Sequence, residues 1–389
     1  MVDGRNAWQK KNVKSNGHKN PCSKNNPMKL LHIIGARPQF IKYFPVQRAM
    51  DQARRRKASL TSVLVHTGQH YDYKMSQVFF DELGIRPPDH HLETGSGNHG
   101  HQTALVLQKT EDVLLKEKPD IVVVYGDTNS TLGGALAAAK LHIPVAHVEA
   151  GLRSYNKAMP EEINRVLTDH LSTYLFCPSQ VAVDNLAAEG IPPDARRPAS
   201  ITPTVSIVGD VMYDLLLHAL AIAKEKSKIL EHLNIRPGQY NLLTLHRAEN
   251  TDDPDRLDAV IDFVNDVTPE IPVLFPMHPR MTRAYAASRK RFKNNIRIIE
   301  PLGYFDLLMA LQNATCLLTD SGGMQKEAYW LQVPCITLRD QTEWVETVQD
   351  GWNVLWHNYR KGYRPRTNTR AYGDGHAAEK IIEMLCNET

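Results

Sequence analysis

From Lys29 onward, short apolar runs alternate with longer amphipathic stretches along the chain. Apolar segments that alternate with helical patterns are typical of parallel β-sheets covered by helices. The alternation therefore predicts an α/β fold. The expected strands are 30–34, 62–66, 121–125, 144–148, 173–177 and 205–208 in the first half, and 241–245, 272–275, 296–299, 315–319 and 334–338 in the second.

Two series of strands predict two doubly wound Rossmann-like domains that face each other across a cleft. The length of 389 residues agrees with two domains. A proline-rich loop at 191–203 is the expected seam between them. We therefore expect a first domain at 28–203, a second at 204–370, and a helix within 371–389 that packs back on the first domain.

The basic charge of the chain is confined to its first 27 residues. They hold six Lys or Arg against one Asp, so the formal charge of +3 leaves −2 for the remainder. An Asn-rich tail with few aliphatic residues predicts a disordered segment, and a body that is not basic disfavours a nucleic-acid partner. Neither a membrane-spanning run nor the apolar core of a signal peptide is found. We expect a cytoplasmic protein with no membrane partner.

Cysteine and histidine patterns do not indicate a metal or redox site. The five cysteines are scattered and form no CxxC, which argues against a disulfide framework and a zinc site. Histidines 90, 91, 99 and 101 lack the spacing that places metal ligands on one helix face. A GxGxxG match at 95–100 follows a polar, proline-broken segment and not a buried strand, so no nicotinamide site is expected. The prediction is no metal and no cofactor.

Ligands of open parallel sheets bind beyond the carboxyl ends of the strands. After the first strand, Pro38 suits the first position of a helix, so Arg37 and Lys42 would converge with free backbone N–H groups on one point. Ion pairing on the surface is the alternative for both cations.

A second candidate loop joins a strand to a helix at Ser321, Gly322 and Gly323. Two glycines where a helix begins let backbone N–H groups and the helix dipole meet a diphosphate. Glu327 lies one turn further on the same face, where its carboxylate would accept ribose hydroxyls. The alternative is an ordinary turn with glycines for tight packing.

Three acids also follow strands or open helices. Asp127 and Glu161 have structural alternatives as a helix cap and as a charge at a helix N-terminus. Glu149 follows an apolar strand end, where an uncompensated carboxylate would be costly, so we expect it to be paired or functional. With His246, these acids would supply proton transfer beside cations for a leaving phosphate.

Seven motifs, taken together and in order, resemble those of the non-hydrolysing UDP-N-acetylglucosamine 2-epimerase family. The resemblance runs from about Lys29 to Trp356. The motifs are Gly35-Ala36-Arg37-Pro38, His66-Thr67-Gly68-Gln69-His70, Gly126-Asp127-Thr128, His147-Val148-Glu149-Ala150-Gly151-Leu152-Arg153, Pro160-Glu161-Glu162-Ile163-Asn164-Arg165, His246-Arg247-Ala248-Glu249-Asn250 and Asp320-Ser321-Gly322-Gly323.

The resemblance implies a fold like that of GT-B glycosyltransferases, a UDP-sugar in the cleft, a homodimer, and no nicotinamide or metal. It implies elimination of UDP to a 2-acetamidoglucal and its return after protonation of C2 from the opposite face. Asp127, Glu149 and Glu161 would carry the acid, base and positioning roles, and His246 would support departure of the diphosphate. The residues implied to contact UDP are Arg37, Lys42, His278, Ser321, Gly322, Gly323 and, on the ribose, Glu327.

One late motif, Thr342-Glu343-Trp344-Val345-Glu346, departs from many members and is more similar to the branch that acts on UDP-2,3-diacetamido-2,3-dideoxyglucuronic acid. The same C2 chemistry on that sugar is therefore an alternative to UDP-N-acetylglucosamine. A glycosyltransferase, a hydrolysing epimerase and a non-enzymatic nucleotide-sugar sensor are further alternatives, which product analysis separates.

Overall fold

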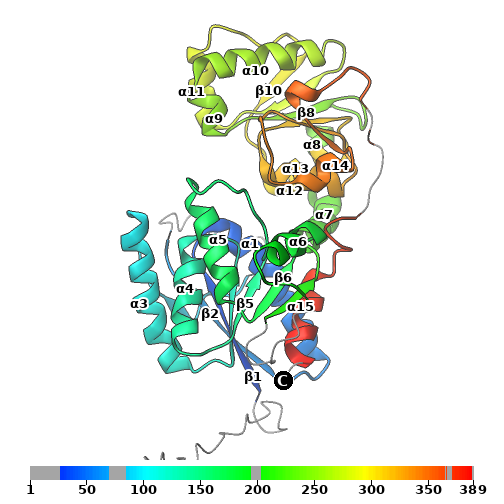
Figure 1. The fold of residues 1–389 in the computed structure, drawn as a ribbon. Coiled ribbons are helices and arrows are strands. Elements are labelled where there is room, and N and C mark those ends of the chain that lie inside the picture. Colours follow the sequence, from blue (N-terminus) through cyan, green and yellow to red (C-terminus); the bar gives the residue numbers. More distant parts are fainter. Residues whose placement is uncertain (1–26, 70–84, 194–202, 364, 366–369, 388–389) are drawn as a thin grey trace, which may run out of the picture.

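A computed structural model describes residues 27–69, 85–193, 203–363, 365 and 370–387. The expected disorder of the N-terminal tail and most of the proline-rich loop lie outside these residues. Two separate bodies, each a parallel sheet covered by helices, make up the described chain (Figure 1). The α/β prediction is confirmed.

The first sheet has seven parallel strands in the order β3-β2-β1-β4-β5-β6-β7. Its strands are β1 (Met28–Ile34), β2 (Leu60–His66), β3 (His90–His91), β4 (Ile121–Tyr125), β5 (Val145–Val148), β6 (Tyr174–Cys177) and β7 (Thr204–Ile207). β1 and β4 are buried along nearly their whole length, as expected for central strands covered on both faces.

The second sheet has six parallel strands in the order β10-β9-β8-β11-β12-β13. Its strands are β8 (Asn241–Thr244), β9 (Val273–Pro276), β10 (Ile296–Ile299), β11 (Leu317–Thr319), β12 (Cys335–Thr337) and β13 (Asn353–Leu355). Both sheets therefore have the strand order of a doubly wound, Rossmann-like fold, as predicted.

The predicted strands are all present, but the predicted seam after residue 203 does not end the first sheet. β7 begins at Thr204 and pairs in parallel with β6, from Tyr174 to Cys177. The proline-rich loop is thus an excursion within the first sheet, between α6 (Gln180–Ala188) and β7. The sequence predicts neither β3 nor β13, because the two residues His90–His91 and the three residues Asn353–Leu355 are not part of a longer apolar run.

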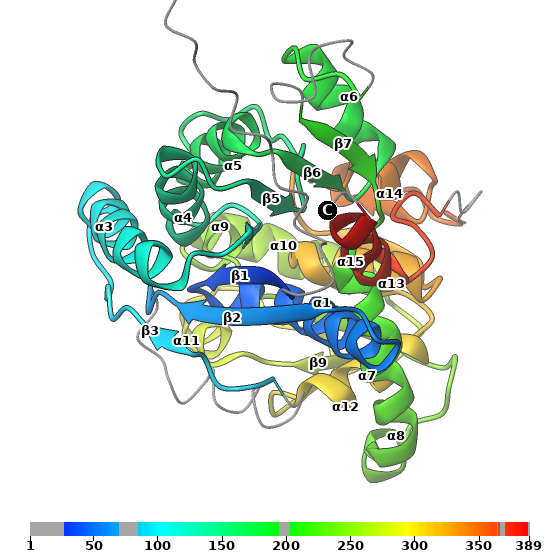
Figure 2. The same ribbon diagram turned by 90° about the horizontal axis from the view of Figure 1, so that it is seen from below.

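Helices cover both faces of the first sheet (Figure 2). On one face, α1 (Arg37–Arg55), the start of α7 (Val211–Lys226) and α15 (Ala377–Asn387) share one apolar core with the strands. On the other face, α3 (His99–Glu117) and α4 (Asn129–Lys140) form a second core. The C-terminal helix of the chain therefore packs on the first domain.

The second sheet is covered in the same way. α10 (Pro254–Val267) and α11 (Pro279–Ala287) pack on one face, and α12 (Tyr304–Gln312) and α13 (Gly322–Trp330) on the other. The remaining helices are α5 (Pro160–Leu171), α8 (Ile229–His232), α9 (Ala248–Thr251), α14 (Val345–Gln349) and the short 3₁₀ helix Trp356–Asn358.

Helix α7 links the two bodies (Figure 1). Near its start, Val211 and Leu215 belong to the core of the first domain. Further along, Leu216 and Ala219 pack against Leu308 of α12 in the second. One continuous helix therefore contributes to both cores and sets the distance between the domains.

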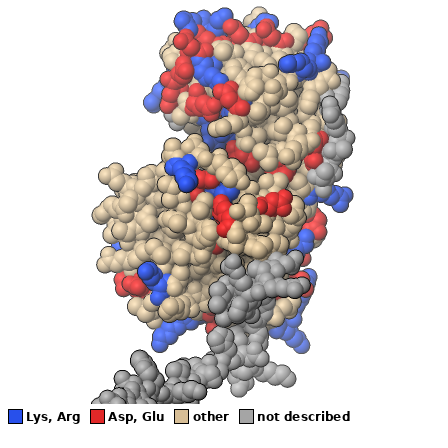
Figure 3. Space-filling view, in the orientation of Figure 1, with Lys and Arg blue, Asp and Glu red and all other residues tan. Residues whose placement is uncertain are grey.

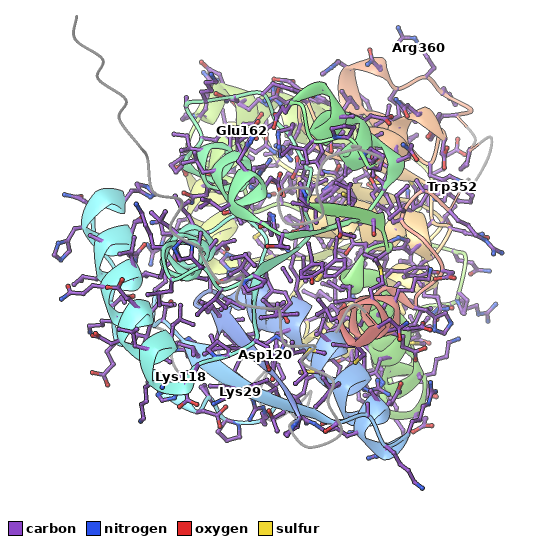
Figure 4. The ribbon with its side chains drawn as sticks, turned by 60° about the horizontal axis from the view of Figure 1, so that its bottom comes forward. Lys29, Lys118, Asp120, Glu162, Trp352 and Arg360 are labelled. Carbon is purple, nitrogen blue, oxygen red and sulfur yellow. The ribbon has the colours of Figure 1, made fainter. Side chains whose placement is uncertain are left out.

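Charged side chains also lie at the amino-terminal ends of the strands of the first sheet. There, Lys29 Nζ lies 2.6 Å from Glu117, and the backbone N–H of Lys29 donates to Asp120 over 2.7 Å. Figure 4 shows Lys29, Lys118 and Asp120 close together, far from Glu162 on α5.

Among the described residues, no helix is both long and apolar enough to cross a bilayer. The cytoplasmic location stays a prediction.

Candidate active site

The strand order reverses between β1 and β4 in the first sheet and between β8 and β11 in the second. At such a point the loops leave the sheet on opposite faces and open a crevice for a ligand. The loops and helices that follow these four strands carry most of the residues that the sequence singles out. Figure 3 shows acidic and basic side chains gathered where the two bodies meet.

Glu149 directly follows β5 and adopts an unusual backbone conformation. Its φ of 75° is in the left-handed region, which side chains other than glycine enter at a cost. The N–H groups of Glu149 and Ala150 both donate to the carbonyl of Phe176 over 3.1 Å, which holds this turn. The strained turn directs the carboxylate onto two ammonium groups.

The Glu149 carboxylate, whose side chain is only 8% exposed, lies between two lysines. Lys42 Nζ of α1 donates to Oε2, and Lys326 Nζ of α13 lies 3.6 Å from Oε1. Burial alone would raise the pKa of Glu149, but Lys42 and Lys326 lower it to about 2. Burial alone would likewise lower the pKa of Lys42, but Glu149 and Asp127 raise it. The structure thus favours the ionised carboxylate, and Glu149 is paired, as one part of the expectation has it.

Gly126 makes room for this pair. Its φ is 62°, and a Cβ there would lie 3.0 Å from Lys42 Nζ and 3.4 Å from Glu149 Oε2. A side chain at this position would push against the Lys42–Glu149 contact and strain the backbone. Glycine at the end of β4 is therefore part of the site.

Asp127 does not cap helix α4. Thr128 occupies the cap position, with its hydroxyl oxygen accepting from the N–H of Thr131. The Asp127 carboxylate instead lies 2.5 Å from Arg165 Nη2 of α5, and its side chain is 31% exposed. The structural alternative for Asp127 is therefore wrong, and the carboxylate remains accessible to a ligand.

The two adjacent glutamates at the start of α5 have different environments. Glu162 is buried and accepts hydrogen bonds from Ser154 N at 2.8 Å and Tyr155 N at 2.9 Å. Its carboxylate also lies 3.1 Å from Arg165 Nη1. Glu161 is exposed. Glu162 thus anchors the loop and Arg165, and Glu161 remains the acid available to a ligand.

A buried ionic network supports these loops from behind. His147 lies between Asp169, 2.7 Å from its Nδ1, and the carbonyl of Gly126, 2.7 Å from its Nε2. Asp169 also accepts from Arg153 Nη1 at 2.7 Å and Gly151 N at 3.1 Å. The network fixes the turns after β4 and β5, which carry Asp127 and Glu149.

In the second domain, Ser321 precedes α13 and Gly322 is its first residue. A Cβ on Gly322 would lie 2.7 Å from Glu343 Oε1 and 3.2 Å from Trp344 Nε1, whereas a Cβ on Gly323 would meet nothing within 4 Å. Gly322 is therefore required for packing, in agreement with the alternative that the glycines of this turn serve tight packing. Gly323 leaves the start of the helix open, as anion binding needs.

Asp320 fixes the neighbouring loop after β8. This buried carboxylate accepts from the backbone N–H groups of His246 and Arg247, both at 3.0 Å. His246 Nδ1 lies 3.4 Å from Asp320, and the ring centroids of His246 and His278 are 6.4 Å apart. The structure therefore brings both histidines to the side of the second sheet where α13 begins.

Glu327 lies one turn into α13 and is buried. Tyr304 donates a hydrogen bond to its Oε1 over 3.1 Å. Burial raises the pKa of Glu327 to about 7, against hydrogen bonding to Tyr304 and attraction to Lys326, which lower it. The carboxyl group can therefore change charge near neutral pH.

Arg37 is the first residue of α1, so the helix begins one residue before Pro38, the predicted first position. The Arg37 side chain lies outside what the structure describes.

His90 lies beside Glu117 and His99 beside Asn129. Within the described residues, no cluster of three or more His, Cys, Asp or Glu suits a metal ion.

Sequence reasoning missed three cations of this site. Arg165 belongs to the quoted Pro160–Arg165 motif, and Arg153 ends the motif that contains Glu149, so both carried a signal. Lys326 carried only its position between Gly323 and Glu327. Its carboxylate partners lie in the other domain, and no pattern in the sequence indicates that contact.

Comparison with known proteins gives consistent matches. Residues 52–386 match the family model for UDP-N-acetylglucosamine 2-epimerase. A UDP-N-acetylglucosamine 2-epimerase homolog of Methanococcus maripaludis is 48% identical, over 92% of this chain and 100% of the relative. A UDP-2,3-diacetamido-2,3-dideoxy-D-glucuronate 2-epimerase of Pseudomonas aeruginosa is also 48% identical, over 92% and 99%. The crystal structure of Methanocaldococcus jannaschii UDP-GlcNAc 2-epimerase with UDP-GlcNAc and UDP matches with a TM-score of 0.74 and 41% identity, covering 92% of this chain and 100% of that one.

Proposed function

The chain belongs to the UDP-N-acetylglucosamine 2-epimerase family, and from this premise we propose that it interconverts UDP-N-acetylglucosamine and UDP-N-acetylmannosamine without hydrolysis. One observation carries the proposal. The ionised Glu149 and the accessible Asp127 lie in one domain, and the open helix start of α13 lies in the other, joined by the contact of Lys326 with Glu149. Such a site can hold a diphosphate and move protons at the sugar.

The chemistry of the substrate sets the demands on the site. No carbonyl adjoins C2, so its proton is not acidic enough for direct removal. In the proposed route, a base takes the C2 proton while the C1–O bond to UDP breaks, giving a 2-acetamidoglucal and UDP. An acid then protonates C2 from the opposite face as the UDP oxygen bonds to C1 again. The route needs an acid and a base on opposite faces of the sugar.

Asp127, Glu149 and Glu161 supply these proton-transfer and positioning roles as a set. Asp127 follows β4, Glu149 follows β5, and Glu161 lies in the first turn of α5, so all three belong to the first domain. Lys42 already contacts Glu149, and it offers a cation to the departing diphosphate from the same position. The local positive charge therefore supports both the ionised carboxylate and the leaving group.

The second domain binds the nucleotide in this proposal. The diphosphate lies at Ser321, Gly322 and Gly323, where the start of α13 and its helix dipole favour an anion. His246 and His278 stabilise the departing phosphate from the adjacent loops, and Arg37, the first residue of α1, is the proposed phosphate contact from the first domain. Glu327 accepts the ribose hydroxyls.

UDP-2,3-diacetamido-2,3-dideoxyglucuronic acid is the second candidate substrate. The Pseudomonas aeruginosa relative named for this sugar is as similar to the chain as the Methanococcus maripaludis relative. The motif that suggests this branch lies against the nucleotide site, because Glu343 and Trp344 flank Gly322. Incubation with each UDP-sugar, followed by proton NMR, distinguishes the two.

A homodimer is a further part of the proposal. Along α5 and the loop before it, apolar side chains are exposed: Ile163 by 48%, Leu167 by 47% and Met159 by 38%. Ile163 and Leu167 are four residues apart and so share one face of the helix. Such a row suits burial by a second copy, and light scattering of the purified protein measures it.

Product analysis tests the proposed reaction. Purified protein with UDP-N-acetylglucosamine should produce the anomeric signals of UDP-N-acetylmannosamine, with no free sugar. Free N-acetylmannosamine with UDP would instead identify a hydrolysing epimerase. An unchanged substrate that binds would support the sensor, and transfer to an acceptor the glycosyltransferase.

A further inference from the structure

Lys326 is a buried lysine that crosses from one domain to the other. Its side chain is 4% exposed, and its Nζ lies 2.6 Å from Asp210 Oδ2 and 3.6 Å from Glu149 Oε1. The same ammonium group lies 3.8 Å from the ring centroid of Trp344, a cation–π contact. Two carboxylates of the first domain and one indole of the second therefore hold it.

Burial of an ammonium group is costly, and an apolar side chain in its place is often no less stable. Packing alone does not explain a lysine here. The position of Lys326 suggests a role in the site, because Lys326 lies on α13, the helix that begins at the proposed diphosphate site. With a rise of about 1.5 Å per residue, Lys326 is about 6 Å along the axis from Gly322.

The two oxygens of Glu149 have different partners. Lys42, on the same domain as Glu149, contacts Oε2, and Lys326, on the other domain, faces Oε1. Only the second contact depends on where α13 lies. Without Lys326, Glu149 would be held by an ammonium group at one oxygen only.

Asp210 connects this contact to the linking helix. Its Oδ1 accepts from the N–H of Met212 over 2.8 Å and so caps α7, while its Oδ2 contacts Lys326. Lys326 therefore also contacts the residue that caps the helix joining both cores. The ammonium group, the start of α7 and the Glu149 carboxylate meet at one place.

We propose that Lys326 is a positioning residue that fixes Glu149 in its reacting orientation from across the boundary between the domains. This inference rests on the proposed function and adds a residue of the nucleotide-binding domain to the proton-transfer site of the other domain.

The charges around Glu149 define a measurable consequence. The groups that face it are Lys42 from α1, Lys326 from α13 and Arg165 from α5, with Asp127 and Asp210 as nearby acids. Loss of Lys326 removes one of three cations. A nearby positive charge lowers a carboxyl pKa by about one unit or more. Without Lys326, the acidic limb of the plot of kcat against pH should therefore move up by about one pH unit.

The test compares Lys326→Met, Lys326→Arg and the surface control Lys140→Met. Methionine keeps the length of the side chain without the charge, and arginine restores the charge. Lys326→Met should lower kcat roughly 100-fold, as a misplaced reacting group does, with UDP affinity by calorimetry unchanged. Its acidic limb should shift up, and Lys326→Arg should restore the limb and part of kcat. Lys140→Met should match the wild type.

A Lys326→Met protein with wild-type kcat and an unshifted acidic limb would overturn the positioning role of Lys326 and leave the proposed function intact. The wild-type protein's own turnover tests that function separately. Should the methionine variant fail to fold by circular dichroism, Lys326→Gln, which can still donate to Asp210, takes its place with the same two measurements.

Discussion

Arg165 Nη2 lies 2.5 Å from the carboxylate of Asp127, and Arg165 Nη1 lies 3.1 Å from Glu162. One guanidinium group thus ties a candidate catalytic acid to a buried anchor on its own helix. Because the guanidinium is planar, its two contacts fix the direction from which it approaches Asp127. The orientation of Asp127 therefore depends on α5.

Replacement of Arg165 by lysine should lower kcat more than it weakens UDP binding. Lysine keeps the charge but offers one ammonium group in place of a fork, so it cannot hold Asp127 and Glu162 together. We expect a loss of roughly 100-fold in kcat, and a UDP dissociation constant that calorimetry finds unchanged. A variant with lost UDP binding and normal kcat would place Arg165 on the nucleotide instead.

Asp127→Asn and Glu149→Gln should each abolish turnover while UDP still binds. Both changes remove proton transfer and leave the helix start of α13 in place. General acid–base catalysis contributes about 100- to 10,000-fold, so the loss should fall at least in that range. Turnover within about tenfold of the wild type in either variant would contradict its assignment.

Glu327 should make the stability of the unliganded protein depend on pH. Burial raises the pKa of Glu327 to about 7 from an ordinary value of 4.5, so between these values the folded protein binds a proton that the unfolded chain has released. The free energy of unfolding must then fall as pH rises from 4.5 through 7. Glu327→Gln cannot ionise and should lack this contribution.

Urea unfolding of the wild type and Glu327→Gln at pH 5 and pH 8 measures this effect. Relative to the glutamine variant, the wild type should be less stable at pH 8 than at pH 5. The same difference at both pH values would show that Glu327 titrates normally.

Gly322→Ala should destabilise the second domain, and Gly323→Ala is its matched control. A Cβ on Gly322 would lie 2.7 Å from Glu343 Oε1 and 3.2 Å from Trp344 Nε1, while one on Gly323 meets open space. Overpacking of this kind costs about 1–3 kcal/mol, so the melting temperature of Gly322→Ala should be lower than that of Gly323→Ala. Equal melting temperatures for the two variants would contradict the packing role.

The sequence predicted most of the architecture because buried parallel strands leave a strong local signal. Runs such as Ile121 to Tyr125 are apolar and short, and the acids that follow them lie at the ends of strands as expected. The extent of the first sheet was mispredicted, because prolines mark a loop but do not say whether the next strand returns to the same sheet.

The ionic partners of the site were harder to predict. Glu149 was expected to be paired, yet its partners Lys42 and Lys326 come from helices in different domains. Such contacts depend on how the domains are arranged, which no local pattern encodes. The choice between Glu161 and Glu162 is similar, because only the fold shows which of the two is buried.

The most direct test of the account is proton NMR of the purified protein with UDP-N-acetylglucosamine in deuterated water. Elimination and re-addition exchange the C2 proton with solvent, so UDP-N-acetylmannosamine should appear with deuterium at C2 and with no free sugar. Glu149→Gln should show neither signal while still binding UDP. Formation of UDP-N-acetylmannosamine that retains its original C2 proton would contradict the proposed proton transfer.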